Sequence, residues 1–212
     1  VPLATPLSGE LGVMRTALLP GLVASLARNA ARQQPRVRLF ELGNVFRTNA
    51  GDAPIETGRI AGAACGDVHA EQWGIAAREI GFHDLKGDLD SLAALAGATL
   101  EYRVSRPAWA HPGRSADVYR DGVQLGWIGQ LHPRLQRALD LDVAVVAFEL
   151  DLAPLFSRSV PRAGAMSKYP SVRRDLAFVV PESVEWSAVE AAVKAAAGPF
   201  LRDLVLFDRY QG

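Results

Sequence analysis

Hydrophobic and polar residues change their spacing several times along the chain, and each change predicts a new element. Residues 18–34 carry leucines and valines at helical spacing, which predicts a helix that tolerates Pro20 in its first turn. Pro35 stops this helix, because proline lacks the N–H that a helix interior needs. Residues 36–47 then read as a strand, and residues 58–65 predict a second strand of small residues that could pair with the first.

Three local signals refine this region. The Gly43-Asn44 pair inside the first predicted strand indicates a bulge or a bend. Residues 84–96 predict the next helix, with Asp84 as its N-cap. Gly97 ends that helix, since glycine readily adopts the conformation that closes a helix.

A tight hairpin is predicted at Asp121-Gly122, because both central residues of this turn type need a positive φ. The strands on either side cover 116–120 and 123–129. Residues 143–150 are rich in β-branched side chains and predict a central strand. The other elements predicted here are a strand at 100–104 and a short helix at 133–139.

The periodic pattern stops at residues 157–168, which mix serine, arginine, proline and glycine and predict a linker. This linker separates a first domain at 1–156 from a second unit at 169–212. The second unit has the outline of a βαβ motif. Its predicted elements are a strand at 175–180, a helix at 187–197 and a strand at 201–210.

Composition excludes several classes of protein. The 212 residues are 49% hydrophobic and 22% charged, which is typical of a globular chain with a core and argues against disorder. Its 23 basic and 23 acidic side chains cancel, so no overall charge attracts nucleic acid. Cys65 is the only cysteine, which excludes an intramolecular disulfide and a thiolate metal cluster, and its small neighbours predict a buried core residue.

Features that would direct the chain to a membrane or out of the cell are missing from the sequence. No apolar run reaches the ~18 residues that a membrane-spanning helix needs, and the first residues lack the pattern of a secretory signal. The chain does not begin with methionine. We therefore expect a piece of a longer protein that works in the cytoplasm.

Few residues have a spacing typical of catalysis. The four histidines include no pair at the spacing of a helical metal site, and no glycine-rich phosphate loop is present. His111 and His132 each precede a proline, and His111 is interpreted as part of a turn that enters the hairpin. Asp84, Asp88 and Asp90 lie near Lys86 and suggest acid–base chemistry or a cation site. Acids at a helix start also favour the helix dipole, so a solvated helix face is preferred.

A series of short stretches, in order and nearly from end to end, resembles one protein family. The stretches are PLS at 6–8, VMRTALLPGL at 13–22, LFELGNVF at 39–46, DLKG at 84–87, HPGRSA at 111–116, GWIG at 126–129 before LHP at 131–133, FELD at 148–151, SKYPSVRRD at 167–175 and FDRYQG at 207–212. The family is that of the bacterial phenylalanine–tRNA synthetase β subunits, in their C-terminal portion.

This resemblance implies an α+β fold in two parts. The first is an antiparallel sheet with flanking helices, similar to the catalytic domain of class II aminoacyl-tRNA synthetases. The second is the first, truncated half of a ferredoxin-like anticodon-binding domain. The resemblance also implies an α2β2 enzyme whose α subunit makes phenylalanyl-adenylate from phenylalanine, ATP and Mg2+ and then charges tRNA(Phe), while this fragment binds no cofactor or metal of its own.

Two class II motifs are degenerate in this sequence. The family pattern has an Arg-x-Glu/Asp pair on the second motif, whereas this chain keeps Arg47 and has Asn49 in place of the acid. The third motif resembles Phe-Gly-x-Gly-x-x-Arg, whose glycines and arginine hold ATP. Here Glu149 and Asp151 replace the glycines, and Pro154 replaces the arginine.

These departures predict that the first domain binds no ATP. Two carboxylates would stand where a triphosphate should lie, and like charges at ~4 Å cost about 4 kcal/mol at an effective dielectric near 20. Loss of the arginine also removes a bidentate clamp on phosphate. The resemblance therefore implies a pseudo-catalytic domain that packs on the α subunit.

The family resemblance assigns anticodon recognition to the end of the chain. Tyr210 is predicted to stack on an unpaired base, and Asp208 to accept a hydrogen bond from the edge of a guanine. Tyr210 could instead cover the core as an aromatic residue at a strand end. Lys168, Arg173 and Arg174 are weaker candidates for phosphate contacts.

The truncation predicts open sheet edges in the second unit. In a ferredoxin-like sheet the first two strands are not neighbours, because the third strand lies between them, and that strand is missing here. We expect the half-domain to be poorly ordered, or two copies to pair their βαβ halves as a homodimer.

Two other classes of function are alternatives to a synthetase fragment. A stand-alone small-molecule enzyme would use His111, His132 and nearby acids, but the sequence offers no pair of nucleophile and base. A stand-alone α+β nucleic-acid-binding protein would need an extended basic stripe, which the sequence lacks.

Overall fold

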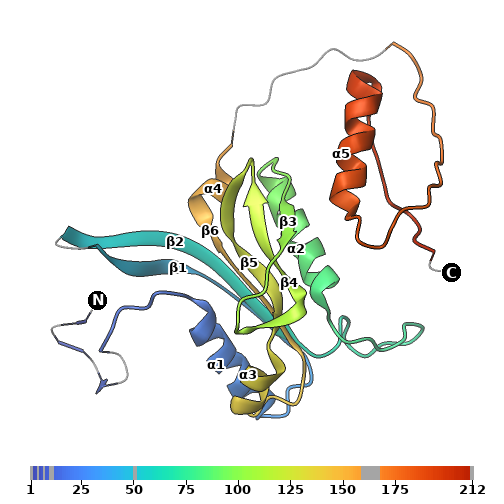
Figure 1. Cartoon of the computed structure of the whole chain (residues 1–212). Helices are drawn as coiled ribbons and strands as arrows, with labels where there is room; N and C mark the ends of the chain where they lie inside the picture. Colours follow the sequence, from blue (N-terminus) through green and yellow to red (C-terminus); the bar gives the residue numbers. More distant parts are fainter. Residues whose placement is uncertain are drawn as a thin grey trace. The chain divides into compact units, whose positions relative to one another are not determined.

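The computed structural model describes residues 2–3, 5–6, 8–9, 12–49, 52–158 and 168–210. Within it the chain divides into two compact units, Val1–Pro161 and Arg162–Gly212. The first unit contains all the β-strands of the described residues, and the second contains one long helix (Figure 1). None of the helices among these residues has the length and hydrophobicity required to cross a bilayer.

The first unit is built on one six-stranded sheet. Its strands are β1 (Val37–Asn49), β2 (Asp52–Cys65), β3 (Glu101–Val104), β4 (Ala110–Arg120), β5 (Val123–Leu131) and β6 (Val145–Asp151). Their order is β1-β2-β6-β5-β4-β3, and every neighbouring pair is antiparallel. β6 lies inside the sheet with both faces buried, which confirms the central strand that its β-branched sequence predicts.

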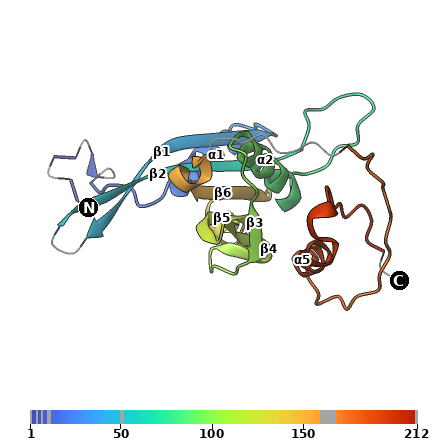
Figure 2. The same ribbon diagram turned by 90° about the horizontal axis from the view of Figure 1, so that it is seen from above.

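Helices cover both faces of this sheet (Figure 2). One face carries α1 (Leu19–Ala30) and α3 (Pro133–Ala138), and the other carries α2 (Phe82–Leu95) and α4 (Leu152–Phe156). Because successive strand residues point to opposite faces, β6 sends Val145 and Ala147 into the first core and Val146, Phe148 and Leu150 into the second. The α+β architecture predicted for this part of the chain is therefore confirmed as an antiparallel sheet with flanking helices.

Local signals at the hairpin and at the cysteine are confirmed. Asp121 and Gly122 have φ values of 51° and 78°, and Arg120 pairs with Val123 across the turn. Cys65 is buried in the core at the end of β2. The short helix α4, which directly follows β6, was not predicted.

The bulge predicted at Gly43-Asn44 is wrong. Gly43 and Asn44 pair in regular register with β2, and the ladder becomes irregular only near the hairpin end, between Arg47 and Asn49. The glycine instead makes room for Arg15, because a Cβ built on Gly43 would lie 2.2 Å from a guanidinium nitrogen of Arg15.

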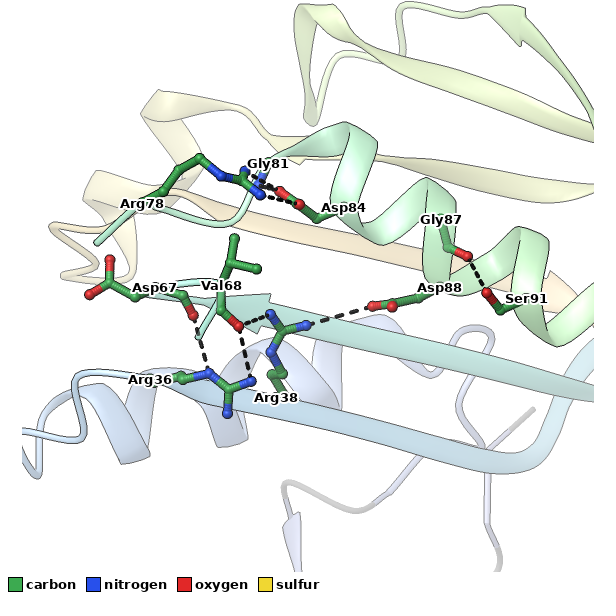
Figure 3. Close-up of polar contacts among 10 residues, drawn as sticks. All are labelled: Arg36, Arg38, Asp67, Val68, Arg78, Gly81, Asp84, Gly87, Asp88 and Ser91. Atoms are coloured by element: carbon green, nitrogen blue, oxygen red, sulfur yellow. Dashed lines mark hydrogen bonds and ion pairs between the residues drawn. The ribbon is translucent and has the colours of Figure 1, made fainter. Parts of the chain in front are cut away.

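Asp84 was predicted as the N-cap of its helix, and this is also wrong by three residues. The N-cap of α2 is Gly81, and the Asp84 carboxylate accepts a hydrogen bond from the Gly81 N–H at 2.8 Å (Figure 3). Arg78 donates two hydrogen bonds to the same carboxylate, at 2.8 and 2.7 Å. Hydrogen bonding by Arg78 lowers the pKa of Asp84 to about 2.

The second unit contains α5 (Trp186–Ala197) and the short 3-10 helix η2 (Gly198–Phe200), which confirms the predicted helix. The strands predicted at 175–180 and 201–210 are wrong, because no residue of 168–210 is paired in a sheet. An extended segment becomes a strand only when a neighbour completes the hydrogen-bond ladder. In a ferredoxin-like sheet a third strand separates these two, and no described residue supplies it.

The second unit therefore exposes apolar side chains that a complete sheet would cover. They include Leu176, Phe178, Val205 and Phe207. The predicted linker at 157–168 lies almost wholly outside the described residues, as do Ser167, Gln211 and Gly212 of the two motifs at the ends of this unit.

Candidate functional site

Glu149 is a buried carboxylate at the centre of the sheet. It lies opposite Ala61 on β2 and Trp127 on β5, and its side chain is only 9% exposed. One carboxylate oxygen, Oε2, accepts hydrogen bonds from the backbone N–H groups of Leu18 and Leu19 at 3.1 and 2.9 Å. These N–H groups stand at the start of α1, so the carboxylate satisfies donors that the helix leaves open and opposes the positive end of its dipole.

Arg59 joins Glu149 to Asp151. Its Nη1 atom donates to Glu149 Oε1 at 2.9 Å and its Nε atom to Asp151 Oδ1 at 2.7 Å. Arg59 is 17% exposed, and its strand position is directly opposite Asp151. Burial alone lowers the pKa of Arg59, but hydrogen bonding with Glu149 and the charges of both acids outweigh this and raise it overall, so the guanidinium stays charged.

The two acids predicted in the third motif are therefore engaged within the protein. Sequence reasoning identified Glu149 and Asp151 but missed Arg59, their common partner. A signal was present, since Arg59 is the only charged residue in the small-residue stretch 58–65. A charge in a strand otherwise suited to burial requires a partner of opposite sign.

The structure does not bring the residues of the second motif into this cluster. Across the sheet, Asp151 on β6 pairs with Arg59 on β2, and Arg59 pairs with Gly43 on β1. Arg47 lies four residues farther along β1, which corresponds to about 13 Å along a strand. Arg47 and Asn49 are both exposed near the end of the β1–β2 hairpin, beyond the end of β6.

Pro154 also serves a structural contact. It lies in α4, and its carbonyl oxygen accepts a hydrogen bond from Arg120 Nη1 at 2.9 Å. The same Arg120 atom donates to the Leu155 carbonyl oxygen at 2.7 Å. This arginine ties the end of β4 to α4, so the Pro154 backbone takes part in anchoring a short helix.

Two indole rings fill the sheet surface beside Glu149. Trp127 is 6% exposed and points to the same face as Glu149, because the two residues are directly paired on β5 and β6. A Cβ on Gly129 would lie 2.7 Å from the Trp127 ring, so the indole covers the glycine backbone. Trp109 packs on Trp127 with ring centroids 4.2 Å apart.

Arg15 is a further residue that sequence reasoning missed. Its Nε atom donates to the Asn44 carbonyl oxygen at 2.8 Å, and its guanidinium forms an ion pair with Glu41. The Phe46 N–H donates to the Arg15 carbonyl oxygen at 2.9 Å. The segment before α1 is thereby fixed to β1, which helps to place the start of α1 over Glu149.

The residues suggested for other chemistry are occupied by local contacts. His111 Nδ1 accepts from the Gly113 N–H, and His132 Nδ1 accepts from the Arg134 N–H, each at 3.1 Å. Lys86 and the Tyr102 hydroxyl both donate to Asp90 at 2.7 Å. Among the described residues, no group of three or more histidine, cysteine or acidic side chains is placed to hold a metal ion.

An apolar groove opens on the α2 face of the sheet, with a cavity volume of about 520 Å3. Phe40 and Leu42 line it from the edge strand β1, Leu89 from α2 and Phe156 from α4. Asp88 is the one charged side chain in its lining. Phe40 is 74% exposed although it belongs to a strand, so this groove is unpartnered in the described chain.

The residues predicted for anticodon recognition lie in the second unit. Tyr210 is 89% exposed and Asp208 is also exposed. Arg173 forms an ion pair with Asp175 at 3.8 Å. Lys168 and Arg174 are exposed, and the structure does not gather these five candidates around one pocket.

Comparison with known proteins gives matches over the whole chain. The family described as the phenylalanyl tRNA synthetase beta chain CLM domain matches residues 1–152, and the ferredoxin-fold anticodon binding domain matches residues 167–212. Similar proteins include the phenylalanine–tRNA ligase beta subunits of Xanthomonas campestris (62% identical over 213 residues), Xanthomonas oryzae (62% over 214) and Xylella fastidiosa (59% over 214).

These relatives are much longer than the chain. Each alignment covers 100% of this chain and 27% of the relative. The chain therefore spans about a quarter of the length of the curated relatives that it matches.

Proposed function

Because the chain belongs to the family of phenylalanyl-tRNA synthetase beta chains, we propose that it supports the charging of tRNA with phenylalanine without performing the chemistry itself. Its first unit is a class II synthetase-like domain that has lost the nucleotide site and serves in assembly with an α subunit. Its second unit belongs to an anticodon-binding domain. The α subunit uses ATP and Mg2+, in the cytoplasm, and the chain itself holds neither.

The observation that carries this proposal is the contact of Glu149 with the start of α1. In the class II pattern a glycine at this position lets ATP approach the strand. Here the carboxylate accepts two backbone N–H groups and one arginine bond, so the space is taken by the protein's own charges. Trp127 and Trp109 fill the adjacent surface of the sheet.

We expect titration of the chain with ATP and Mg2+ in a calorimeter to give no binding in the micromolar range. A triphosphate would have to displace Arg59 from two carboxylates and would leave Glu149 buried against further negative charge. An α subunit of the same enzyme is the positive control. Saturable micromolar binding of ATP by this chain would contradict the proposal.

Assembly with the α subunit is supported by the groove and the open edge of β1. β1 is an edge strand whose backbone is bonded to Arg15 only at Asn44 and Phe46 in the described contacts, and the groove beside it exposes apolar side chains. Surfaces of both kinds are common sites of association with another chain.

Sedimentation tests this part of the proposal in two arms. With a matching α subunit, we expect a stable complex at micromolar concentration, and we expect Phe40→Asp to weaken it.

Without the α subunit, we expect two copies of the chain to associate through the extended segments of their second units. A chain shortened to residues 1–158 should lose this self-association. Absence of any complex with the α subunit would contradict the assembly role.

A further inference from the structure

The segment between β2 and α2 forms a loop, here called the Trp73 loop (residues 67–79), that presents an aromatic side chain to solvent. Trp73 is 99% exposed, and Ile75 beside it is 51% exposed. Gly74 separates them with a φ of 82°, a left-handed conformation that places both apolar side chains at the tip of a turn. Neither residue contributes to the core of the first unit.

Side chains at the start of β1 and at the start of α2 hold the base of the loop (Figure 3). Arg36 donates to the carbonyl oxygens of Asp67 and Val68 at 3.1 and 3.2 Å, and Arg38 donates to that of Val68 at 3.0 Å. Where the loop returns toward α2, the Asp84 carboxylate at the start of that helix fixes Arg78.

Backbone contacts close the same base. The Val68 N–H donates to the Arg78 carbonyl oxygen at 2.8 Å, and the Ile80 N–H donates to that of Gly66 at 2.9 Å. Gly66 has a φ of 81°, and a Cβ there would lie 1.9 Å from the Pro35 carbonyl oxygen, so the entry to the loop requires glycine. The ends of the loop are thus fixed before any partner arrives.

The charge of the loop distinguishes between two kinds of partner. The loop and the side chains that hold its base contain five carboxylates against three guanidiniums, and the residues are Asp67, Glu71, Glu79, Asp84 and Asp88 against Arg36, Arg38 and Arg78. An exposed tryptophan can stack on an unpaired base, but nucleic-acid readers surround such residues with positive charge. A net negative loop repels phosphate, so the charge favours a protein surface with an apolar pocket and a basic rim.

The fixed base also favours a separate chain over another part of the same chain. Association of two molecules loses translational and rotational freedom, and a preformed anchor reduces the additional cost of ordering a loop. A contact within one chain has a high effective concentration and gains less from such preparation. Tryptophan is also the residue type most enriched among dominant interface contacts.

We propose that the Trp73 loop is an anchor that inserts Trp73 into an apolar, basic-rimmed pocket of the partner subunit of the synthetase. This inference rests on the proposed function, because it takes the partner to be the α subunit. It adds a named contact that is separate from the apolar groove beside β1.

The test measures the affinity of the full-length β subunit for the α subunit, with Trp73→Ala and the matched control Leu95→Ala. Leu95 is a 75% exposed apolar residue at the end of α2. We expect Trp73→Ala to weaken the affinity about 30-fold or more, as for a dominant interface tryptophan, and Leu95→Ala to leave it unchanged. Trp73→Phe should recover most of the loss, and Glu71→Lys should weaken binding more at low salt than at high salt.

Hydroxyl-radical footprinting of Trp73 supplies a second readout. We expect its oxidation to be rapid in the isolated full-length β subunit and suppressed in the αβ complex. Protection already in the isolated subunit would mean that the rest of the chain, or a second copy, covers the loop, and would overturn the inference. An unchanged subunit affinity with Trp73→Ala, or a loss confined to tRNA binding, would also overturn it. If wild-type subunits fail to assemble, the proposed function itself fails.

Discussion

Replacing Arg59 with alanine will reduce the unfolding free energy of the first unit by about 3–5 kcal/mol. Among the described residues, Arg59 is the one cation paired with Glu149, whose side chain is 9% exposed beneath α1 in the native structure, and the variant removes it. Two backbone N–H groups remain as donors, but a buried carboxylate without its arginine keeps most of its desolvation cost. Arg59→Ala should therefore lower the midpoint of chemical unfolding far more than a surface substitution.

The control is Arg103→Ala, which removes an ion pair with Glu101 in which both side chains are 56% exposed, and a cation–π contact with the Tyr119 ring at 4.0 Å that contributes about 0.5–1 kcal/mol. Exposed pairs of this kind contribute at most about 1 kcal/mol. A double variant, Arg59→Ala with Glu149→Gln, tests the cause directly, because it removes the unpaired charge and should recover part of the lost stability. Equal losses from Arg59→Ala and Arg103→Ala would show that the buried cluster does not stabilise the fold.

The features of the first unit that could be predicted from sequence are those encoded locally. The Asp121-Gly122 turn depends on two residues that tolerate positive φ, and β6 depends on a β-branched run suited to burial on both faces. The position of β6 between β2 and β5 also follows the general tendency of such runs to lie inside a sheet.

Arg59 and Gly43 required the tertiary structure. Arg59 meets Glu149 across 90 residues of sequence, and Arg15 meets Glu41 across 26, so no local pattern records either contact. Gly43 is interpreted as a bulge from sequence because glycine is favoured both at a bulge and where a side chain comes close to the backbone. The sequence alone does not distinguish these two situations. The sequence identified the acids of the site, whereas their partners depend on which strands become neighbours.

The strands predicted for the second unit are wrong for a related reason. Its segments at 175–180 and 201–210 have the composition of strands, but a strand exists only in a ladder, and no described residue completes one. The same condition bears on the anticodon candidates. Tyr210 and Asp208 lie on the second of these segments, so their geometry toward RNA depends on a partner strand that fixes it.

Tyr210→Ala should weaken binding of tRNA(Phe) by the complex of the full-length β subunit with its α subunit about 5- to 150-fold, since stacking of one base on an aromatic ring contributes roughly 1–3 kcal/mol. Tyr210 is 89% exposed, so the variant removes no core contact in the described structure. We expect the effect in the dissociation constant and in KM for tRNA. The rate of phenylalanine-dependent exchange between ATP and pyrophosphate should stay unchanged, because the proposed function assigns formation of the adenylate to the α subunit.

Two further variants separate stacking from a general loss of exposed aromatic surface. Tyr210→Phe keeps the ring and should retain most of the affinity, whereas Phe200→Ala, at a residue that is 92% exposed in the same unit, should have no effect. Replacing the anticodon nucleotides one at a time by abasic sites should reduce the penalty of Tyr210→Ala only at the base that stacks, because any base offers a π-face to the ring. If all anticodon substitutions leave that penalty unchanged, Tyr210 does not read the anticodon, and its exposure in this unit reflects only the absence of a neighbouring strand among the described residues.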